Sequence, residues 1–421
     1  MEKIKFKTKA ILAIVAIIMC VSLAVPLLLG VNASSTGSSD ESSVTPEMFG
    51  AVGDGVADDT AALQSALNTG KSVFLSKTYK VTELDCAGLS KIVMYGKEDV
   101  TARLSSFPVA NDTYNIIFEG AELFKNAPSK VSLEGIRFYA KNAGILITTK
   151  LDGAWIKQCN FTYFGGLFMG GMEKLCQISE NVFFQMKGTF ATNCVDSIIT
   201  NNYINSALTA RTTLFTGTNF AGMYFQGNFV DYCKTAFGEY ANWQYNRIEG
   251  NIFDSIFRVF DTKYNFNDTT VTGNDFVRIY YTDFNEGQWG TYADEQMMSE
   301  EWTIFYIRGK CNRTNISGNA GEAQATLNFY VNRPNDTHID LSGVDGEMEF
   351  KYSNTSADFV PTIFVKDLDY INVDSLPNAA LYNTAGNYRY SFNMQHVVYQ
   401  NNVYINLNGT WVKMTNNEPQ S

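Results

Sequence analysis

Two aspartates, Asp261 and Asp283, follow two regularly spaced asparagines, Asn251 and Asn274, at distances of ten and nine residues. If the segments that begin at such asparagines stack on one another, equivalent positions lie about 5 Å apart. Two carboxyl groups at about that separation suit a retaining glycosidase, in which one is the nucleophile and the other the acid. The same pair could instead hold Ca²⁺ against a uronate ligand. Both chemistries stay open at this pair.

Other familiar catalytic patterns are missing from the sequence. It contains only two histidines, His338 and His396, and each stands alone. It has no HExxH, CxxC, nucleophile-elbow or phosphate-loop motif, which argues against a metalloprotease, a redox enzyme and a nucleotide-binding enzyme. The single Asp58-Asp59 pair precedes a helical pattern, so we interpret it as a helix start.

A short pattern recurs through the middle of the chain: an apolar residue, small or polar residues, an asparagine, then an apolar or aromatic pair. Between the asparagines, apolar residues alternate with the period of two that short strands show. A unit of this length that holds several strands is one turn of a solenoid. We therefore predict an all-β parallel β-helix with a structural asparagine ladder, because Asn tolerates a left-handed bend. The spacings are 21, 21, 26, 23, 23 and 45 residues, the last counted as two turns, between Asn160, Asn181, Asn202, Asn228, Asn251, Asn274 and Asn319.

Both ends of the repeat carry patterns that could cap a solenoid. Residues 60–68 predict a helix with one apolar face, started by Asp58 or Asp59 and ended at Gly70. Short strands are expected at 72–75 and 78–81. Residues 351–421 lose the repeat, and 396–413 predict a strand meander with an Asn-Gly turn. We expect a β-helix domain at 45–350 and a C-terminal cap or small β module at 351–421.

The first 33 residues predict export from the cytoplasm. Four lysines precede a long apolar run, which fits a cleaved signal peptide or a membrane anchor, and a Ser/Gly-rich linker follows at 34–44. Both alternatives place the protein at the cell surface or in the medium. Removing this segment takes away four Lys and one Glu, so the net charge falls from −11 to −14. Such a charge argues against nucleic acid or an anionic membrane as partner.

Six cysteines remain after Cys20, and we expect them to be buried free thiols, because a chain of this size has a large core.

The segment from Phe49 to Leu67, FGAVGDGVADDTAALQSAL, closely resembles the N-terminal signature of the pectate-lyase-like superfamily, which includes rhamnogalacturonase- and epimerase-like enzymes and phage tailspikes. With the repeat, the resemblance covers about residues 45–350. It implies a right-handed parallel β-helix and a polysaccharide partner. The similarity to tailspikes also leaves open that the protein forms a trimer. The sequence departs from the family pattern at residues 76–78, which are Ser-Lys-Thr where the family often has a Pro-Ala-Gly-type turn. The Asn-Thr-Asp, Gly-His-Gly and Arg-Ile-Lys motifs of polygalacturonase-like hydrolases are absent.

The resemblance also implies where a site would lie, since catalytic groups of these enzymes cluster six to eleven residues past the ladder position. On that basis the candidate catalytic residues are Asp261, Asp283, Arg258 and Lys234. Arg258 or Lys234 would bind or deprotonate a uronic acid. The candidate substrate-binding residues are Glu239, Trp243, Lys187, Arg211 and Trp302.

Two functions follow from these observations, because the superfamily contains both enzymes and non-catalytic binders. One is an extracellular lyase or glycosidase that acts on acidic or plant-type glycans. The other is a non-catalytic glycan-binding surface protein or adhesin. The candidate site residues could also have no function beyond solubility, because any solenoid face needs polar side chains to stay soluble.

Overall fold

The computed structural model describes residues 43–96, 114–206, 212–238, 243–262, 266–279, 303–307 and 313–323, and then separate strands as far as Lys413. By its contacts the chain divides into residues 1–41 and residues 42–421, and the described residues belong to the second unit. The predicted export segment at 1–33 lies outside the described residues.

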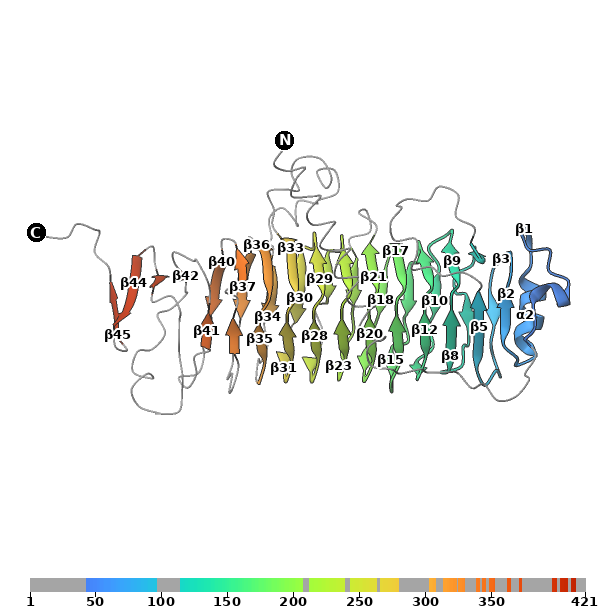
Figure 1. Cartoon of the computed structure of the whole chain (residues 1–421), viewed down its shortest axis with the longest axis horizontal. Coiled ribbons are helices and arrows are strands. Elements are labelled where there is room, and N and C mark those ends of the chain that lie inside the picture. Colours follow the sequence, from blue (N-terminus) through green and yellow to red (C-terminus); the bar gives the residue numbers. More distant parts are fainter. Residues whose placement is uncertain are drawn as a thin grey trace, which may run out of the picture. The chain divides into compact units, whose positions relative to one another are not determined.

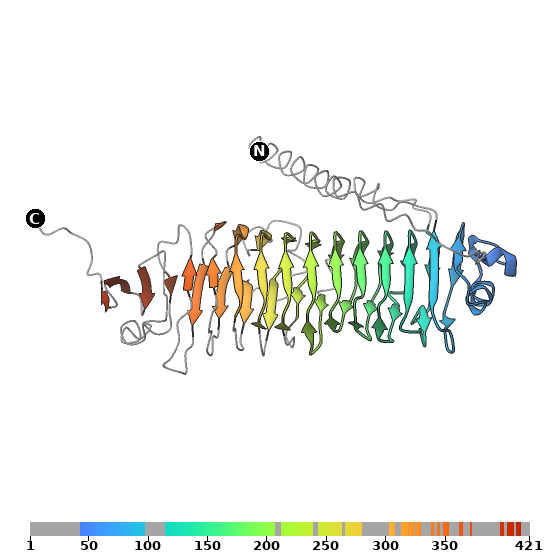
Figure 2. The ribbon, with the colours of Figure 1, turned by 60° about the horizontal axis from the view of Figure 1, so that its bottom comes forward.

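The described chain is a right-handed parallel β-helix, as predicted (Figure 1). Each turn passes through up to four short strands, and each strand pairs in parallel with its equivalent one turn later. Figure 2 shows the same turns after rotation. We number the four sheets 1 to 4 in the order in which a turn visits them.

Sheet 1 has twelve strands in the described chain: β2 (Val73–Leu75), β5 (Ile92–Gly96), β8 (Val131–Glu134), β12 (Trp155–Lys157), β16 (Gln177–Ser179), β20 (Ile198–Thr200), β24 (Tyr224–Gln226), β28 (Arg247–Glu249), β32 (Thr270–Thr272), β35 (Asn315–Ser317), β38 (His338–Asp340) and β41 (Thr362–Phe364). Sheet 2 also has twelve: β1 (Asp54–Asp58), β3 (Thr78–Val81), β6 (Ile116–Phe118), β9 (Arg137–Ala140), β13 (Asn160–Thr162), β17 (Val182–Met186), β21 (Tyr203–Ser206), β25 (Phe229–Asp231), β29 (Ile252–Asp254), β33 (Asp275–Ile279), β36 (Ala320–Ala323) and β39 (Gly343–Asp345).

Sheets 3 and 4 are shorter within the same described ranges. Sheet 3 consists of β10 (Ile145–Ile147), β14 (Gly166–Phe168), β18 (Thr189–Ala191), β22 (Thr213–Phe215), β26 (Thr235–Phe237), β30 (Arg258–Thr262), β34 (Thr303–Ile307), β37 (Ala325–Phe329) and β40 (Met348–Tyr352). Sheet 4 consists of β11 (Leu151–Asp152), β15 (Met172–Glu173), β19 (Cys194–Val195), β23 (Phe220–Ala221), β27 (Trp243–Gln244) and β31 (Phe266–Asn267). A further pair joins β4 (Leu84–Asp85) to β7 (Phe124–Lys125).

The asparagine ladder forms at the corner between sheets 1 and 2. In each step a buried side-chain amide donates to the Oδ1 atom of the next asparagine, at 2.9–3.1 Å. The same Oδ1 atom also accepts a backbone N–H of the preceding turn, which explains why burial of these polar groups is tolerated. The ladder contains Asn181, Asn202, Asn228, Asn251, Asn274 and Asn319.

Two details of the predicted ladder are wrong. Asn160 is not a member, because it pairs in register with Val182, and Cys159 occupies the ladder position on that turn. The left-handed bend lies one residue before each asparagine, at Asn201 or Gly250 for example, and not at the ladder residue itself. This explains the glycines that precede four of the asparagines.

The interval of 45 residues between Asn274 and Asn319 is one turn and not two. The two side chains are in direct hydrogen-bond contact, and β32 and β33 pair directly with β35 and β36. The extra residues, including 280–302, therefore all fall within a single connection, between sheets 2 and 3.

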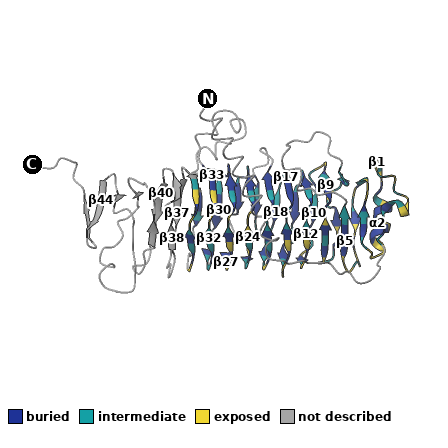
Figure 3. Ribbon diagram, viewed as in Figure 1, coloured by how far each residue is buried: buried dark blue, intermediate teal, exposed yellow. Residues whose placement is uncertain are grey.

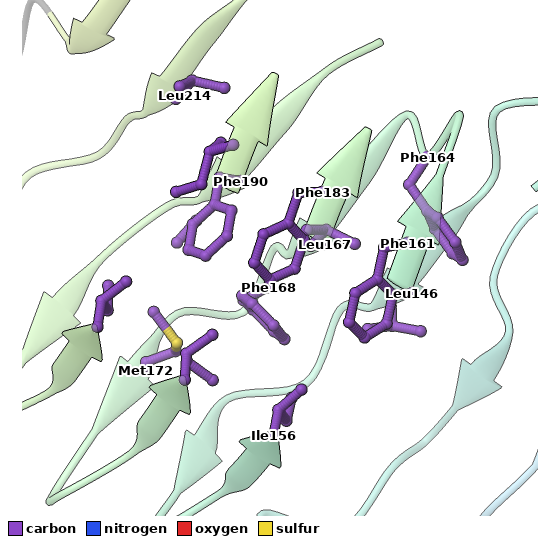
Figure 4. Close-up of a cluster of buried hydrophobic side chains, with 14 of the residues drawn as sticks. Leu146, Ile156, Phe161, Phe164, Leu167, Phe168, Met172, Phe183, Phe190 and Leu214 are labelled. Carbon is purple, nitrogen blue, oxygen red and sulfur yellow. The ribbon is translucent and has the colours of Figure 1, made fainter. Parts of the chain in front are cut away.

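Phenylalanines fill the interior of the solenoid and stack from turn to turn. Phe161 lies 4.9 Å from Phe138 and 5.2 Å from Phe183, with nearly parallel rings. Figure 4 shows Phe161 and Phe183 among other buried side chains, and Figure 3 shows the buried positions along the strands. Stacked aromatic pairs of this kind add to the stabilisation from burial.

Five of the cysteines are described, and all five are free and buried, as expected: Cys86, Cys159, Cys176, Cys194 and Cys233. Burial raises the pKa of Cys86 to about 12, so this thiol is unreactive at neutral pH.

The N-terminal cap has the predicted helix, α2 (Thr60–Asn68), after a short 3₁₀ helix η1 (Pro46–Phe49). The two candidate capping aspartates have different roles. Asp58 accepts the backbone N–H of Thr60, whereas the Asp59 carboxylate accepts the N–H groups of Val52 and Gly53. Asp59 therefore fixes the preceding loop against the helix start. Gly70, with φ of +69°, follows the helix as expected.

Parallel pairing continues past residue 350, since β37 pairs with β40 and β38 pairs with β41. The predicted meander at 396–413 is confirmed: β43 (His396–Tyr399), β44 (Asn402–Leu407) and β45 (Thr410–Lys413) are antiparallel neighbours, and β42 (Ile371–Asn372) adds a parallel strand.

Candidate functional site

Asp261 and Arg258, two of the predicted catalytic residues, contact each other in β30. Arg258 Nη1 donates to Asp261 Oδ2 at 2.8 Å, and the guanidinium carbon lies 4.4 Å from the centre of the Tyr306 ring. Asp261 has no exposed surface, and its register partner on the next turn is Tyr306. Asp283 lies outside the described residues, so the predicted pairing of its carboxylate with that of Asp261 stays a prediction.

The prediction that Trp243 stacks on sugar rings is wrong. Trp243 is fully buried and packs against Phe220 and Phe237 at ring distances of 5.2 and 5.0 Å. It belongs to the core because its side chain faces the interior from β27. Three other predicted binding residues, Glu239, Arg211 and Trp302, lie outside the described residues.

Lys187 and Lys234 lie in the connections between sheets 2 and 3. Lys187 precedes β18 and is exposed, with its ammonium group 5.0 Å from the centre of the Tyr163 ring. Lys234 precedes β26 and is half-buried. Residues 207–211 and 280–302 also belong to connections between sheets 2 and 3.

A polar cluster that the sequence analysis missed lies at the C-terminal ends of β25 and β29. Asp231 and Asp254 pair in register on adjacent turns. Both face outward, because the preceding Val230 and Phe253 lie in the core. Yet they are only 6% and 7% exposed, so their charges are largely removed from water.

Asp254 forms a two-pronged ion pair with Arg278 of the following turn. Arg278 Nε donates to Asp254 Oδ1 at 2.7 Å, and Nη2 donates to Oδ2. Arg278 has a φ of +55° and lies at an irregularity in the pairing of β33 with β36. The equivalent residues on the two preceding turns, Tyr232 and Ser255, also have left-handed φ values of +55° and +57°, so this bend is a regular corner of the solenoid.

Asp231 has a different environment. Its Oδ2 atom accepts hydrogen bonds from Tyr203 Oη at 3.2 Å and from Asn205 Nδ2 at 3.4 Å. Its Oδ1 atom is buried and has no hydrogen-bond partner within the described chain. Burial, and after it the charge of Asp254, raise the pKa of Asp231 well above its ordinary value, although Arg278, Tyr203 and Asn205 lower it. The same burial raises the pKa of the Tyr203 hydroxyl.

Two neighbouring carboxyl groups with such different surroundings can divide the roles of acid and base between them. Asp231 can carry a proton, and Asp254 can supply a negative charge held in place by Arg278. A sequence signal for this pair exists. Asn202, Asn228 and Asn251 are each followed, three residues later, by the cluster residues Asn205, Asp231 and Asp254.

No three His, Cys, Asp or Glu side chains gather into a group that could hold a metal ion in the described part of the chain. The predicted Ca²⁺ ligand Asp283 lies beyond it. No helix among the described residues is long and apolar enough to span a membrane.

No family model and no curated protein sequence matches this chain. Several solved structures do match this chain in their fold. The catalytic unit of a GH87 α-1,3-glucanase from Streptomyces thermodiastaticus aligns with 80% of this chain at 11% identity and a TM-score of 0.47. This chain covers 66% of that unit's length. The tailspike of an Acinetobacter phage aligns with 91% of this chain, and 67% of the tailspike is covered, at 11% identity and a TM-score of 0.42.

DFA-IIIase from Arthrobacter chlorophenolicus aligns with 79% of this chain and is covered over 91% of its own length, at 12% identity and a TM-score of 0.39. These likenesses concern the fold alone. Any function has to be argued from the residues of this chain.

Proposed function

We propose that this protein is an extracellular polysaccharide-processing protein in which Asp231 donates a proton to the glycosidic oxygen of a bound glycan. The observation that carries the proposal is the pairing of a buried Asp231, whose pKa is raised, with the ion-paired Asp254 one turn away. The charged and apolar export segment at 1–33 supports a location outside the cytoplasm.

The chemistry assigned to each group follows from its contacts. Asp231 Oδ1 is buried in the free protein, so proton donation requires that glycan binding exposes this atom. Its proton would then make the leaving sugar oxygen a neutral hydroxyl. The positive charge that develops on the other sugar ring would be stabilised by the Asp254 carboxylate, either directly or through a covalent glycosyl ester. This arrangement favours a glycosidase over a lyase, because elimination needs a base to remove a carbon-bound proton. We keep acidic or plant-type glycans as the substrate classes of the proposal, because local basic residues can bind an acidic glycan even on a protein of net charge −11.

A second function, non-catalytic glycan binding at a cell surface, is favoured by one observation. Asp231 and Asp254 are almost fully covered, whereas the Arg278 side chain is 41% exposed. A polymer that touched only this outer layer would be bound without being cleaved.

Incubation of the purified protein with a panel of neutral and acidic polysaccharides separates the two functions. For the glycosidase we expect new reducing ends without unsaturated products, lost in Asp231→Asn and kept in the control Asp261→Asn. Binding without products from any polymer would support the second function. Full turnover by Asp231→Asn would contradict the role of Asp231.

A further inference from the structure

We propose that the outer face of sheet 1 binds a second copy of this chain, in an antiparallel dimer whose two-fold axis passes through Ile198. Sheet 1 runs along one side of the solenoid (β12, β20 and β28 in Figure 1). The inference goes beyond the proposed function, because Asp231 and Asp254 belong to sheet 2.

Three large apolar side chains are exposed along this face. Trp155 begins β12 and is 47% exposed, and Leu175 and Tyr245 lie two residues before β16 and β28 and are 65% and 64% exposed. Leu175 and Tyr245 have left-handed φ values of +66° and +58°, which bulky side chains rarely adopt. Exposed apolar residues gathered on one face mark a binding surface. The corner itself does not require a large residue, since the same position on other turns is glycine or aspartate: Gly153, Asp196, Gly222 and Asp268.

The first residues of β12, β16, β20, β24 and β28 form a row across five turns. They face outward, because the residue that follows each of them in its strand is buried. At about 4.8 Å between neighbouring strands, the row is about 19 Å long, with Ile198 at its centre. Each member pairs in register with the next: Trp155, Gln177, Ile198, Tyr224 and Arg247.

This row complements itself when its order is reversed. A two-fold axis that passes through Ile198, parallel to the strands, sets the same row of the second copy against it in the opposite order. Ile198 then meets its own counterpart, and Gln177 meets Tyr224. Trp155 faces Arg247 of the second copy, a cation–π contact that the symmetry forms twice. Arg247 is exposed and forms no ion pair with a described residue, so its charge is available for this contact.

A second row, two residues later in each strand, is complementary in charge. Lys157 of β12 and Glu249 of β28 lie two turns to either side of the axis. The reversed order therefore brings the Lys157 ammonium group towards the Glu249 carboxylate of the second copy. Lys157 Nζ lies 3.6 Å from Glu180 of its own chain, so the new contact would join three charges in a network. Opposite charges at matched positions favour a second copy over an unrelated partner.

The corner before sheet 1 places large residues opposite small ones under the same axis. Tyr245 faces Gly153 of the second copy, where an added Cβ atom would meet only a backbone carbonyl, at 3.6 Å. Leu175 faces Gly222, beside which the Asp196 carboxylate lies. Asp196 is on the turn that carries the axis, so its charge faces its own counterpart. This like-charge contact opposes the dimer, and its removal gives a test of opposite sign.

The face is small compared with a standard interface of about 800 Å² per partner, so we expect a Kd in the micromolar range and monomers in dilute solution. Sedimentation equilibrium over about 1–100 μM protein measures this association. Ile198→Glu places two charges on the axis and should weaken association at least about tenfold, whereas Asp196→Asn should strengthen it severalfold. The matched control is Val56→Glu, which should leave association unchanged, because Val56 is 73% exposed but lies in β1 of sheet 2.

Cross-linking tests the register of the two copies. Ile198→Cys brings one thiol of each copy together on the axis, so a mild oxidant should join them in a disulfide-linked dimer. Gln177→Cys should not cross-link, because Gln177 faces Tyr224 of the second copy. A chain that stays monomeric at the highest concentration, equal effects of Ile198→Glu and Val56→Glu, weaker association of Asp196→Asn, or equal cross-linking of the two cysteine variants would overturn the proposal.

Discussion

Asp231 and Asp254 occupy paired positions of β25 and β29, one turn apart, and only Asp254 is ion-paired with Arg278. The parallel register brings two like charges together on a face with little solvent. Burial, and after it the charge of Asp254, raises the pKa of Asp231. The ion pair of Asp254 with Arg278 and the burial of Asp231 both predict measurable effects on stability as well as on activity.

Replacing Arg278 with Gln should destabilise the protein by about 1–2 kcal/mol, because Asp254 would stay partly buried without its cation. The figure is below that of a fully buried pair, since the Arg278 side chain is 41% exposed and screened by water. Urea unfolding measures the change. Arg247→Gln is the control: Arg247 is exposed on β28 and forms no ion pair with a described residue. It should shift stability by less than about 0.5 kcal/mol. Equal effects of the two changes would contradict the assignment.

Asp231 should make stability depend on pH in a defined direction. Because its pKa is raised in the folded state, chiefly by burial, the folded protein retains a proton that the unfolded chain releases above the ordinary value of 3.8. The free energy of unfolding should therefore fall as the pH rises from that value towards the folded pKa. Asp231→Asn removes this contribution, so its stability relative to the wild type should increase between pH 4 and pH 7. A difference that stays constant over this range would show that the pKa is not raised.

The ladder makes a sharper prediction about stability. Asn251 accepts from Asn228 at 2.9 and 3.1 Å and donates to Asn274 and the Phe225 carbonyl. Asn251→Ala leaves a buried N–H without an acceptor and should cost about 2–4 kcal/mol. Asn160→Ala, off the ladder although it comes from the same sequence pattern, should cost less than about 1 kcal/mol. Unfolding transitions of the two variants that coincide would contradict the ladder described above.

The bend before each ladder asparagine can be tested at Gly250. Its φ is +62°, and an added Cβ atom would meet nothing within 4 Å, so only backbone strain opposes a side chain. Gly250→Asn should cost little, because Asn201 adopts a φ of +55° at the equivalent position. Gly250→Val should cost about 1–2 kcal/mol more than Gly250→Asn. Thermal unfolding of the pair checks the order, and a valine variant as stable as the asparagine variant would contradict it.

The sequence was sufficient for the architecture because the ladder demands one residue type at one position per turn. Asn181 through Asn274 could be found by spacing alone. Asn160 was misassigned because an asparagine happens to follow Cys159, the residue that holds the ladder position. The interval before Asn319 was counted as two turns because residue number does not distinguish an extra turn from a long insertion in one turn.

The candidate site was less predictable, since it depends on which corner of the turn carries the polar groups. The search window began six residues past the ladder, whereas Asp231 and Asp254 follow Asn228 and Asn251 by three. Burial could not be judged from sequence either. Trp243 and Asp261 look accessible by residue type, but the structure covers both completely.

The central claim is that Asp231 is a proton donor, and its own titration tests this most directly. The carboxyl carbon of Asp231, assigned by comparison with Asp231→Asn, can be followed by ¹³C NMR as the pH is varied. We predict a midpoint well above 3.8, the ordinary value for this side chain. A midpoint at or below that value would contradict the account, because an Asp231 that is already ionised in mildly acidic solution has no proton to give.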